Sequence, residues 1–460
     1  MFRNIVTTFS NCFKIPELKS RILFTVAVLA ICRLMALIVI PGLDGGTLAS
    51  FLEKNSARGG VLGLFSTFTG GAMEHCAIGS LGIMPYISAT IIIQLLTAVI
   101  PQLSKMAREE GGRTKIIQYG RYLTVLLCLG QGMAMAIGWE HPQAIFGGDI
   151  GRIVLYSDAH IWLYRLQTVL ILTTGAMLMM WLGEQITERG IGNGVSLIIT
   201  IGILARLPQA GQGLYDMFFG AAASSENGTK TGLAILLLAL LIAVIGGIIA
   251  ITQAQRKIPV QYAQRAVGRK VYSGGTSFMP LRVNYPGVMP IIFAGAILMF
   301  PQKIFMFLGG SWNVPFLQQI ARALNDGSPL YLTLYALMIL FFSYFWVATQ
   351  FNELQIADDL KKNGGYIPGV RPGQATSDYL HNSMSRITLA GAVILVVIAV
   401  IPQILYDWMK VPRPVGQFFG GTSMLITVGV LLDTMRQMES HLLMRHYDGF
   451  LKKGKLKGRF

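Results

Sequence analysis

The chain has 460 residues, of which 53% are hydrophobic and only 13% are charged, with 38 Lys and Arg against 22 Asp and Glu. Soluble domains carry about 25% charged residues, so a soluble protein of this length would expose apolar surface that it could not cover. The composition therefore excludes an ordinary soluble globular protein and indicates a protein that lies in a membrane.

Hydrophobic segments recur along the whole chain. A helical crossing of a bilayer needs about 20 apolar residues, and ten segments meet or approach that length. They lack the alternation of apolar and polar residues that is typical of a membrane β-barrel. We therefore predict an all-α polytopic membrane protein with ten transmembrane helices. The predicted spans are residues 22–41, 76–100, 119–139, 161–182, 191–207, 231–251, 285–308, 330–351, 384–405 and 416–434.

The first span is expected to stay in the membrane rather than to be removed as a signal peptide, because nine more follow it and no small-residue cleavage site is evident. Residues 60–73, which come next, read GVLGLFSTFTGGAM and are too short to cross a bilayer. They lack the strongly polar face of an interfacial helix, which is the alternative interpretation. We predict a re-entrant half-helix with a hinge at Gly70 and Gly71.

The positive charges predict the orientation. If both termini are cytosolic, the inside segments hold 26 Lys and Arg residues and the outside loops hold eight. By the positive-inside rule this ratio favours a cytosolic N-terminus and C-terminus. The inside segments are residues 1–21, 101–121, 183–190, 252–284, 352–383 and 435–460.

Two inside segments carry more positive charge than orientation requires. Residues 252–284 contain six basic residues and no acidic one, and residues 435–460 contain seven basic residues. Attraction to anionic lipid headgroups is one explanation, and it stays open for the tail. For 252–284 we expect a docking surface for an acidic partner or for RNA phosphates.

The two halves of the chain resemble each other weakly. Gly-Ile-Met-Pro at 82–85 corresponds to Gly-Val-Met-Pro at 287–290, and residues 194–200 share Gly, Ser, Ile and Thr in register with 421–427. Because each half has five spans, a duplication would place the halves in opposite orientations. The predicted parts are an N-terminus at 1–21, a first half at 22–207, an external hinge loop at 208–230, a second half at 231–434 and a tail at 435–460.

Ionisable side chains are nearly absent from the predicted spans. Arg33 is the only clearly mid-span charge, and we expect it to make a polar contact between helices. No catalytic set, zinc-ligand spacing or phosphate-binding glycine loop is present, and Cys12, Cys32, Cys76 and Cys128 have no paired spacing, so neither an enzyme nor a cofactor is expected. The interrupted spans offer aliphatic side chains, which can gate a pore by excluding water. They are Ile83, Ile87, Val195, Ile199, Ile292 and Ile426.

Four stretches of the sequence resemble one family over essentially the whole chain. The chain is similar to the SecY/Sec61-alpha family of protein-conducting channels. The resemblance implies two inverted halves, hinged on one side, with a lateral gate to lipid between spans two and three and spans seven and eight. The stretches are residues 81–96, 181–194, 366–373 and 420–426.

Roles for individual residues follow from this resemblance. It implies that the six aliphatic residues form a pore ring, in which Val195 is smaller than the usual isoleucine, and that residues 60–73 form the plug. Arg371 corresponds to a functionally critical loop arginine. The plug residues are Val61, Leu62, Leu64, Phe65 and Phe68, the polar gate residues are Gln94, Gln131 and Asn193, and the docking residues are Arg256, Lys257, Arg265, Arg269, Lys270 and Arg371.

The family also implies partners and a place in the cell. These are the subunits SecE and SecG, the SecA ATPase, the ribosome, precursors with signal sequences, anionic lipids, and the bacterial inner membrane. The implied function is a channel that translocates unfolded polypeptides and releases transmembrane segments sideways. Two other hypotheses remain, a secondary transporter of solutes or lipids and an insertion scaffold without an aqueous pore. The scarcity of ionisable residues in the spans counts against the transporter.

Overall fold

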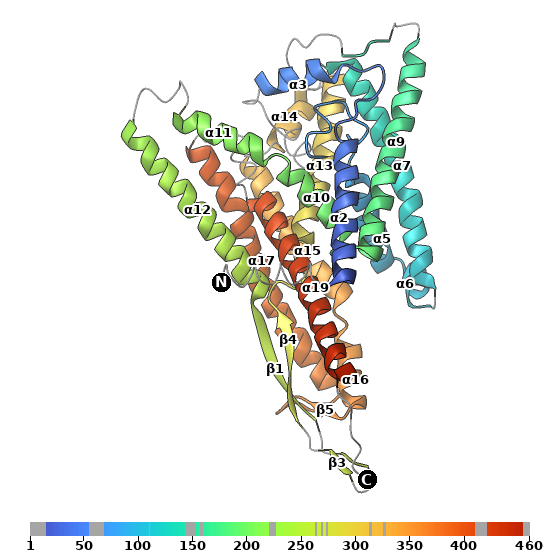
Figure 1. Cartoon of the computed structure of the whole chain (residues 1–460), viewed down its shortest axis with the longest axis vertical. Coiled ribbons are helices and arrows are strands. Elements are labelled where there is room, and N and C mark those ends of the chain that lie inside the picture. The colour runs from blue at the N-terminus through green and yellow to red at the C-terminus, as the bar shows by residue number, and fades with distance from the viewer. Residues whose placement is uncertain are drawn as a thin grey trace. The chain divides into compact units, whose positions relative to one another are not determined.

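The computed structural model is mostly helical, and the chain divides into two compact units (Figure 1). The first unit comprises residues 1–223, 412–418 and 426–460, and the second comprises 224–411 and 419–425. The structure describes residues 15–54, 69–109, 111–142, 153–156, 160–219, 227–262, 265–267, 270–272, 275–311, 315–324, 328–409 and 421–453.

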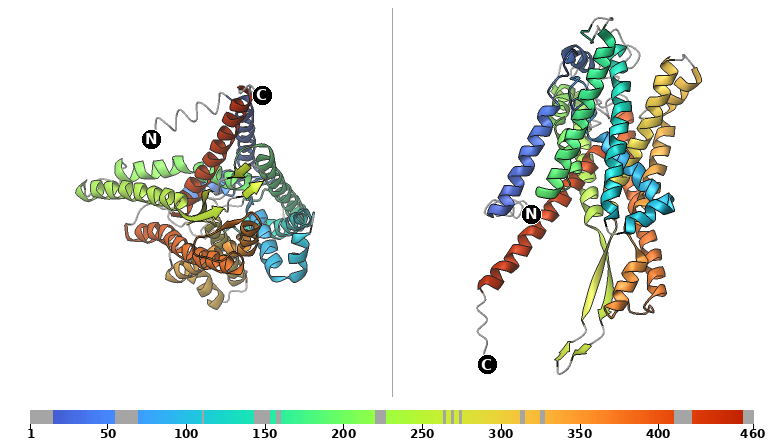
Figure 2. Two further views of the ribbon diagram at one scale, coloured as in Figure 1. Left: turned by 90° about the horizontal axis from the view of Figure 1, so that it is seen from below. Right: turned by 90° about the vertical axis from the view of Figure 1, so that its right-hand side faces the viewer.

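The first unit is built around helices α7 and α9, which pack against each other along their lengths (Figures 1 and 2). Helix α5 packs on α7, and α2 and α10 pack on α9. Trp139, Tyr164 and Leu172 are buried between α7 and α9, and the Tyr164 hydroxyl donates to the Ala136 carbonyl at 3.2 Å. The helices are α2 Pro16–Met35, α3 Gly45–Lys54, α5 Met84–Val99, α6 Pro101–Arg108, α7 Gly112–Glu140, α9 Ile161–Arg189, α10 Gly194–Leu204, α11 Leu207–Phe219 and α19 Gly421–Lys453.

The second unit is built around α15, which packs on α13 and on α17. Aromatic rings join α13 to α15, with Phe293 edge-on to Phe342 and Trp346 at centroid distances of 5.8 and 5.4 Å. Such edge-to-face pairs are favourable because the ring edge is positive and the ring face is negative. The helices are α12 Asn227–Gln253, α13 Met289–Ser311, α14 Pro315–Ala323, α15 Pro329–Gln350, α16 Glu353–Lys362 and α17 Gln374–Met409.

The basic segment 252–284 forms a β-ribbon, which the sequence analysis treated only as a loop. Strands β1 Gln255–Tyr262 and β4 Thr276–Arg282 pair antiparallel, from Gln255 opposite Arg282 to Gln261 opposite Thr276. Short strands β2 Arg265–Val267 and β3 Lys270–Tyr272 pair at the tip of the ribbon (Figures 1 and 2). β5 Gly365–Tyr366 adds a third strand beside β1.

The two Gly-x-Met-Pro motifs have the same local structure. Gly82 and Gly287 have positive φ angles of 57° and 66°. Helices α5 and α13 then begin at Met84 and Met289, with proline as the second helical residue. A positive φ is easy only for glycine, and proline is favoured in a first helical turn, so each motif ends a loop and starts a helix.

The helix boundaries differ from several predicted spans. Span 76–100 begins as a helix only at Met84, because positive-φ Gly82 ends the preceding turns. The chain then bends by 104° between α5 and α6. The cause is Pro101, which forces Ile100 out of the helical region to φ −90° and ψ 114°.

The structure confirms a helical protein with several apolar spans. Six helices in the described part of the chain are long and apolar enough to cross a bilayer, and seven if the bent pair α5–α6 is one crossing. Each of the ten predicted segments overlaps a helix. Helix α10 has only 11 residues and continues after a turn into α11, so it is too short to cross alone. Ten crossings in two inverted halves therefore remain a prediction.

Candidate functional site

The six aliphatic residues of the expected ring lie at helix starts or within helices. Ile83 and Ile87 lie at the start of α5, Val195 and Ile199 one turn apart on α10, and Ile426 near the start of α19. Ile292 lies in the first turn of α13, in the second unit. All are buried except Val195, which is half-buried.

Gly183 of α9 brings two of these residues together. A methyl group at Gly183 would lie 3.4 Å from Ile83 Cδ1 and 3.7 Å from Val195 Cγ2. The side chains of α5 and α10 therefore converge over the same point of α9. The sequence offered no signal for this contact beyond the glycine itself, which lies in the 181–194 stretch.

A small cavity lies beside Ile83 in the first unit. Its volume of about 20 Å³ is room for about one water molecule. Arg33, at the end of α2, borders it and donates from Nη1 to the Gly70 carbonyl at 2.6 Å. Arg33 thus makes the expected polar contact, but its partner is a loop carbonyl rather than a second helix. The lining residues are Cys32, Arg33, Ala36, Thr69, Gly82, Ile83, Met179, Ile198, Ile201 and Gly202.

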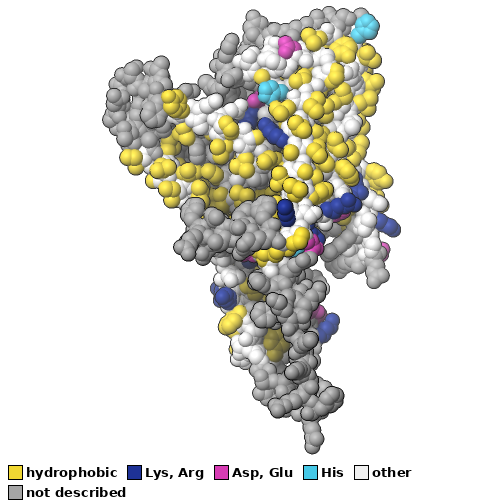
Figure 3. Space-filling model, in the orientation of Figure 1, with side chains coloured by type: hydrophobic (Ala, Val, Ile, Leu, Met, Phe, Trp, Pro, Cys, Tyr) yellow, Lys and Arg dark blue, Asp and Glu magenta, His cyan; other side chains and the backbone are white. Residues whose placement is uncertain are grey.

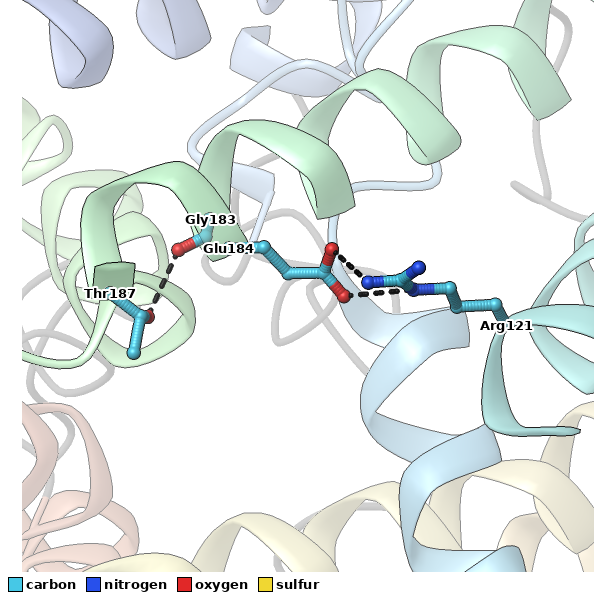
Figure 4. A network of polar contacts seen from close by, with 4 residues as sticks. All are labelled: Arg121, Gly183, Glu184 and Thr187. Atoms are coloured by element: carbon cyan, nitrogen blue, oxygen red, sulfur yellow. Dashed lines mark hydrogen bonds and ion pairs between the residues drawn. The ribbon is translucent and has the colours of Figure 1, made fainter. Parts of the chain in front are cut away.

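Two ion pairs join α7 and α9 at opposite ends. Arg121 contacts both carboxylate oxygens of Glu184 at 3.2 and 2.8 Å (Figure 4). Arg165 makes two bonds of 2.7 Å to Glu140, and its guanidinium lies 5.6 Å from the Trp162 ring. Neither pair was predicted from the sequence.

A signal for these pairs exists in the sequence. The two partners on each helix are 19 residues apart, Arg121 to Glu140 on α7 and Arg165 to Glu184 on α9. At about 1.5 Å per residue this spacing is about 28 Å, close to the thickness of the hydrocarbon layer. Antiparallel helices with this spacing can place one charge pair at each edge of the lipid.

The expected gate residues occupy different environments. Gln94 of α5 and Gln131 of α7 are half-buried, and these two helices pack together. Asn193 is the N-cap of α10, and its Oδ1 accepts from the Ser196 N–H at 3.2 Å. Asn193 therefore has a local role in starting α10, which the resemblance did not indicate.

The docking residues of the β-ribbon are exposed where the structure describes them. Arg256 and Lys257 lie exposed on β1, while Ile258 and Val260 of the same strand are buried. Arg265 lies in β2 and Lys270 in β3, and Arg269 lies outside the described residues. Hydrophobic side chains make up much of the face that Figure 3 shows.

The structure joins the β-ribbon to the loop of Arg371. Gln261 and Tyr262 of β1 pair with Tyr366 and Gly365 of β5, and the Tyr366 hydroxyl donates to Gln261 Oε1 at 3.0 Å. Five residues after β5, Arg371 is exposed. The two basic loops that the sequence predicts to be cytosolic are therefore one connected surface.

The Arg371 turn is held by its neighbours. Gly369 and Gly373 have positive φ angles of 82° and 106°. The Arg371 carbonyl accepts from the Thr376 hydroxyl at 2.9 Å, and the Val370 N–H donates to the Ile367 carbonyl at 3.0 Å. Ile367 is buried beneath the ribbon with Ile258, so the turn is anchored while the arginine side chain stays in solvent.

The plug residues Val61, Leu62, Leu64, Phe65 and Phe68 lie outside the described residues. The structure does describe the hinge, where Gly70 and Gly71 have positive φ angles of 64° and 88°. These angles fit a sharp reversal of the chain before α5.

Cysteine and metal chemistry is not part of the described site. Cys32, Cys76 and Cys128 are free and buried, and Cys12 lies outside the described ranges. In the part of the chain that the structure describes, no three His, Cys, Asp or Glu side chains are placed to hold a metal ion.

Comparisons with known proteins identify relatives over nearly the whole chain. The model of the SecY family matches residues 77–435. The protein translocase subunit SecY of Chlamydia trachomatis is 42% identical over 99% of this chain and 100% of its own length. The subunit of the same name from Escherichia coli K12 is 43% identical over 96% of each chain.

Solved structures share the fold at lower identity. One described as the structure of a protein conducting channel superposes with a TM-score of 0.59 at 17% identity, over 92% of both chains. Sec61 in the canine ribosome-channel complex from the endoplasmic reticulum gives a TM-score of 0.55 at 16% identity, again over 92% of both chains.

Proposed function

We propose, since this chain belongs to the SecY family, that it is the channel through which unfolded polypeptides cross a membrane and from which hydrophobic segments pass sideways into the lipid. The observation that carries this proposal is identity of 42–43% over nearly the full length of named translocase subunits. The family is one of translocation channels rather than catalysts. The comparisons do not support the alternative of a solute or lipid transporter.

We also propose ten crossings in two inverted five-helix halves. The support is a packing pattern among the helices of the first four predicted spans, which recurs among the helices of spans six to nine. Helix α2 packs on α9 as α12 packs on α17, α5 packs on α7 as α13 packs on α15, and α7 packs on α9 as α15 packs on α17. A duplication with an odd number of spans predicts this recurrence, with the second half inverted in the membrane.

The proposed pathway is closed by the aliphatic ring and by the plug at 60–73. An aliphatic constriction excludes water and ions at rest. It also offers no strong specific contact to a passing chain, so it can yield to any side chain. The burial of five of the six residues fits a closed ring. Lateral release would occur between spans two and three and spans seven and eight, with Gln94, Gln131 and Asn193 near that gate.

The proposed location is the bacterial inner membrane, with both termini in the cytosol. The excess of 26 basic residues over eight supports this orientation. The β-ribbon and the Arg371 turn then lie on the cytosolic side, where a motor or ribosome meets the channel.

The proposed partners are the subunits SecE and SecG, the SecA ATPase, the ribosome, precursor chains and anionic lipids. Exposed Arg256, Lys257 and Arg371 supply the positive charge that RNA phosphates or an acidic protein surface would contact. The channel of the canine complex is described with a ribosome, which is the relationship proposed here for the ribbon.

One experiment separates the candidate functions. The purified chain with its small partner subunits is placed in lipid vesicles with a secretory precursor, ATP and a SecA-type motor. A channel produces precursor that is protected from added protease inside the vesicles. A solute transporter or an insertion scaffold without a pore produces no protected precursor, and that result would contradict the proposal.

A further inference from the structure

The turn before α10 is held by side chains rather than by backbone pairing. Four backbone N–H groups between residues 191 and 196 donate to side-chain oxygens, and three of these oxygens come from other helices. The bonds are Ile191 to Thr25 Oγ1 of α2 at 3.1 Å, Gly192 to Gln437 Oε1 of α19 at 2.8 Å, Gly194 to Thr187 Oγ1 of α9 at 2.9 Å, and Ser196 to Asn193 Oδ1 at 3.2 Å.

Thr187 is the central contact between this turn and α9. Its hydroxyl donates to the Gly183 carbonyl at 3.0 Å (Figure 4) and accepts from the Gly194 N–H, so one side chain bridges two backbones. The approach is very close, since a methyl group at Gly194 would lie 1.9 Å from the Gly183 carbonyl oxygen. Only glycine at position 194 lets α10 begin at this distance from α9.

The same segment of α9 lies against two residues of the proposed ring, Ile83 and Val195. Gly183 lies at this contact, and the next residue, Glu184, is bound to Arg121 of α7 (Figure 4). The Glu184 side chain is 18% exposed, whereas that of Arg121 is 44% exposed. The stretch 181–194 thus connects α7, α9 and α10 at one point.

We propose that Gly183, Thr187 and Gly194 form a seat that sets the position of the ring residues on α10, and that Gln437 links this seat to α19. We call these three residues the α10 seat. The proposal rests on the proposed function of the ring. Val195 directly follows Gly194, and Ile199 follows one turn later, so a shift of the helix start moves both side chains. Gln437 lies on the helix that carries Ile426, so these hydrogen bonds join α9 to two helices that carry ring residues, α10 and α19.

Ordinary helix packing is the competing explanation. Packing alone needs the glycines for close approach, but it does not need one hydroxyl to bridge both backbones. Loss of packing lowers the amount of assembled channel and its activity for every precursor. A displaced ring instead seals less well, so it raises the leak of ions at rest and admits precursors with weak signals.

The test uses Thr187→Val in the complete channel complex. This change keeps the shape of the side chain and removes both hydrogen bonds. We expect the ion conductance of the idle channel, per assembled complex in a planar bilayer, to rise about two- to tenfold, as loss of the one bond that joins α9 to α10 at Gly194 predicts. Export of a precursor with a crippled signal should rise with it. Thr187→Ser, which keeps the hydroxyl, should restore both values.

Thr174→Val is the matched control. Thr174 lies on the same helix, is exposed as Thr187 is, and donates to the carbonyl four residues earlier at 2.7 Å, but it accepts from no backbone N–H that the structure records. It should leave conductance and export unchanged. If Thr187→Val does not assemble, Gln437→Met removes the acceptor for Gly192 from a different helix and should give the same leak.

Ile426→Asn serves as the reference for the ring itself. If Ile426→Asn leaks while assembled Thr187→Val and Gln437→Met do not, the ring stands and the seat is overturned. If Ile426→Asn is also silent, the proposed ring fails, and the seat loses its role with it. Leak from Thr174→Val equal to that from Thr187→Val would likewise reduce the seat to general packing.

Discussion

At the scale of single residues, the proposed ring would have to meet demands that only aliphatic side chains combine. It must block ions at rest, seal around a moving polypeptide and hold no particular substrate. Ile199 and Ile426 are buried, with 1% and 0% of their surface exposed. A polar side chain in their place would hydrate the constriction and weaken the closed state.

Ile426→Asn tests this requirement. Placing an amide in the ring should cost the closed state roughly 1–3 kcal/mol, a factor of about five to 150 in the ratio of open to closed channels. We expect export of a precursor with a crippled signal to rise, with some added ion leak. Ile339→Asn is the control, because Ile339 of α15 is equally buried but outside the ring. It should only lower assembly, and equal gains of export from both variants would contradict the ring.

Arg371 is the second residue whose role can be separated from its surroundings. It is exposed on an anchored turn, so its replacement should not disturb the fold. We predict that Arg371→Glu leaves membrane insertion intact and lowers motor-driven translocation at least about tenfold, as expected when a charged group is lost from an interface. Lys361→Glu changes the charge of the same loop equally. Normal translocation by Arg371→Glu, or equal loss in both variants, would leave Arg371 as one more positive-inside charge.

At the scale of elements, the β-ribbon has one buried face and one exposed face. Its strands alternate, with Ile258 and Leu281 buried on one face and Lys257 and Phe278 exposed on the other. The buried face packs on Ile367, on residues of α15 and α17, and on Phe351, which directly follows α15. A charged segment, which the proposed orientation places in the cytosol, is thereby fixed to α15 and α17.

Ile258→Ala should loosen the ribbon without disturbing the helices. Truncating a buried isoleucine costs about 2–5 kcal/mol. We expect faster cleavage of the ribbon by a protease added from the cytosolic side, with the membrane helices still protected. Phe278→Ala is the control, since Phe278 is 59% exposed. Equal cleavage rates in Ile258→Ala and the parent would show that the buried face does not hold the ribbon.

At the scale of the whole molecule, the basic loops and the two ion pairs between α7 and α9 predict the same position of the helices in a membrane. The basic loops predict which ends of the helices are cytosolic, and the pairs Arg121–Glu184 and Arg165–Glu140 lie about one hydrocarbon thickness apart along α7 and α9. Arg121 and Glu184 mark the cytosolic edge in this orientation, and Arg165 and Glu140 mark the outer edge.

Single cysteines test this orientation. In a chain with Cys12→Ser, a membrane-impermeant maleimide should label Ser277→Cys on β4 only from the cytosolic side and Ser50→Cys on α3 only from the outside. Both serines are exposed, and both lie outside the predicted spans. The other three cysteines are buried, so the chain with only Cys12→Ser should stay unlabelled. Labelling of both sites from the same side would contradict the orientation.

Much of this protein could be predicted without its structure. Composition indicates a membrane protein, the Gly-x-Met-Pro motifs mark two helix starts, and the glycines before and after Arg371 mark a turn. These features are local, because hydropathy, positive φ and proline geometry depend on a few neighbouring residues. The resemblance to a channel family rested on motifs just as local, and the full-length relatives confirmed it.

Other features were decided only by tertiary structure. The bridge of Thr187 between Gly183 and Gly194, the strand that joins Tyr366 to Gln261, and the Arg121–Glu184 pair all bring distant residues together. Nothing in a local pattern tells a lipid-facing threonine from one that bridges two helices. The neighbours of a threonine in sequence do not show which other helix lies against it. Close approach of backbones is a property of two elements at once, so it can be read only when both are in place.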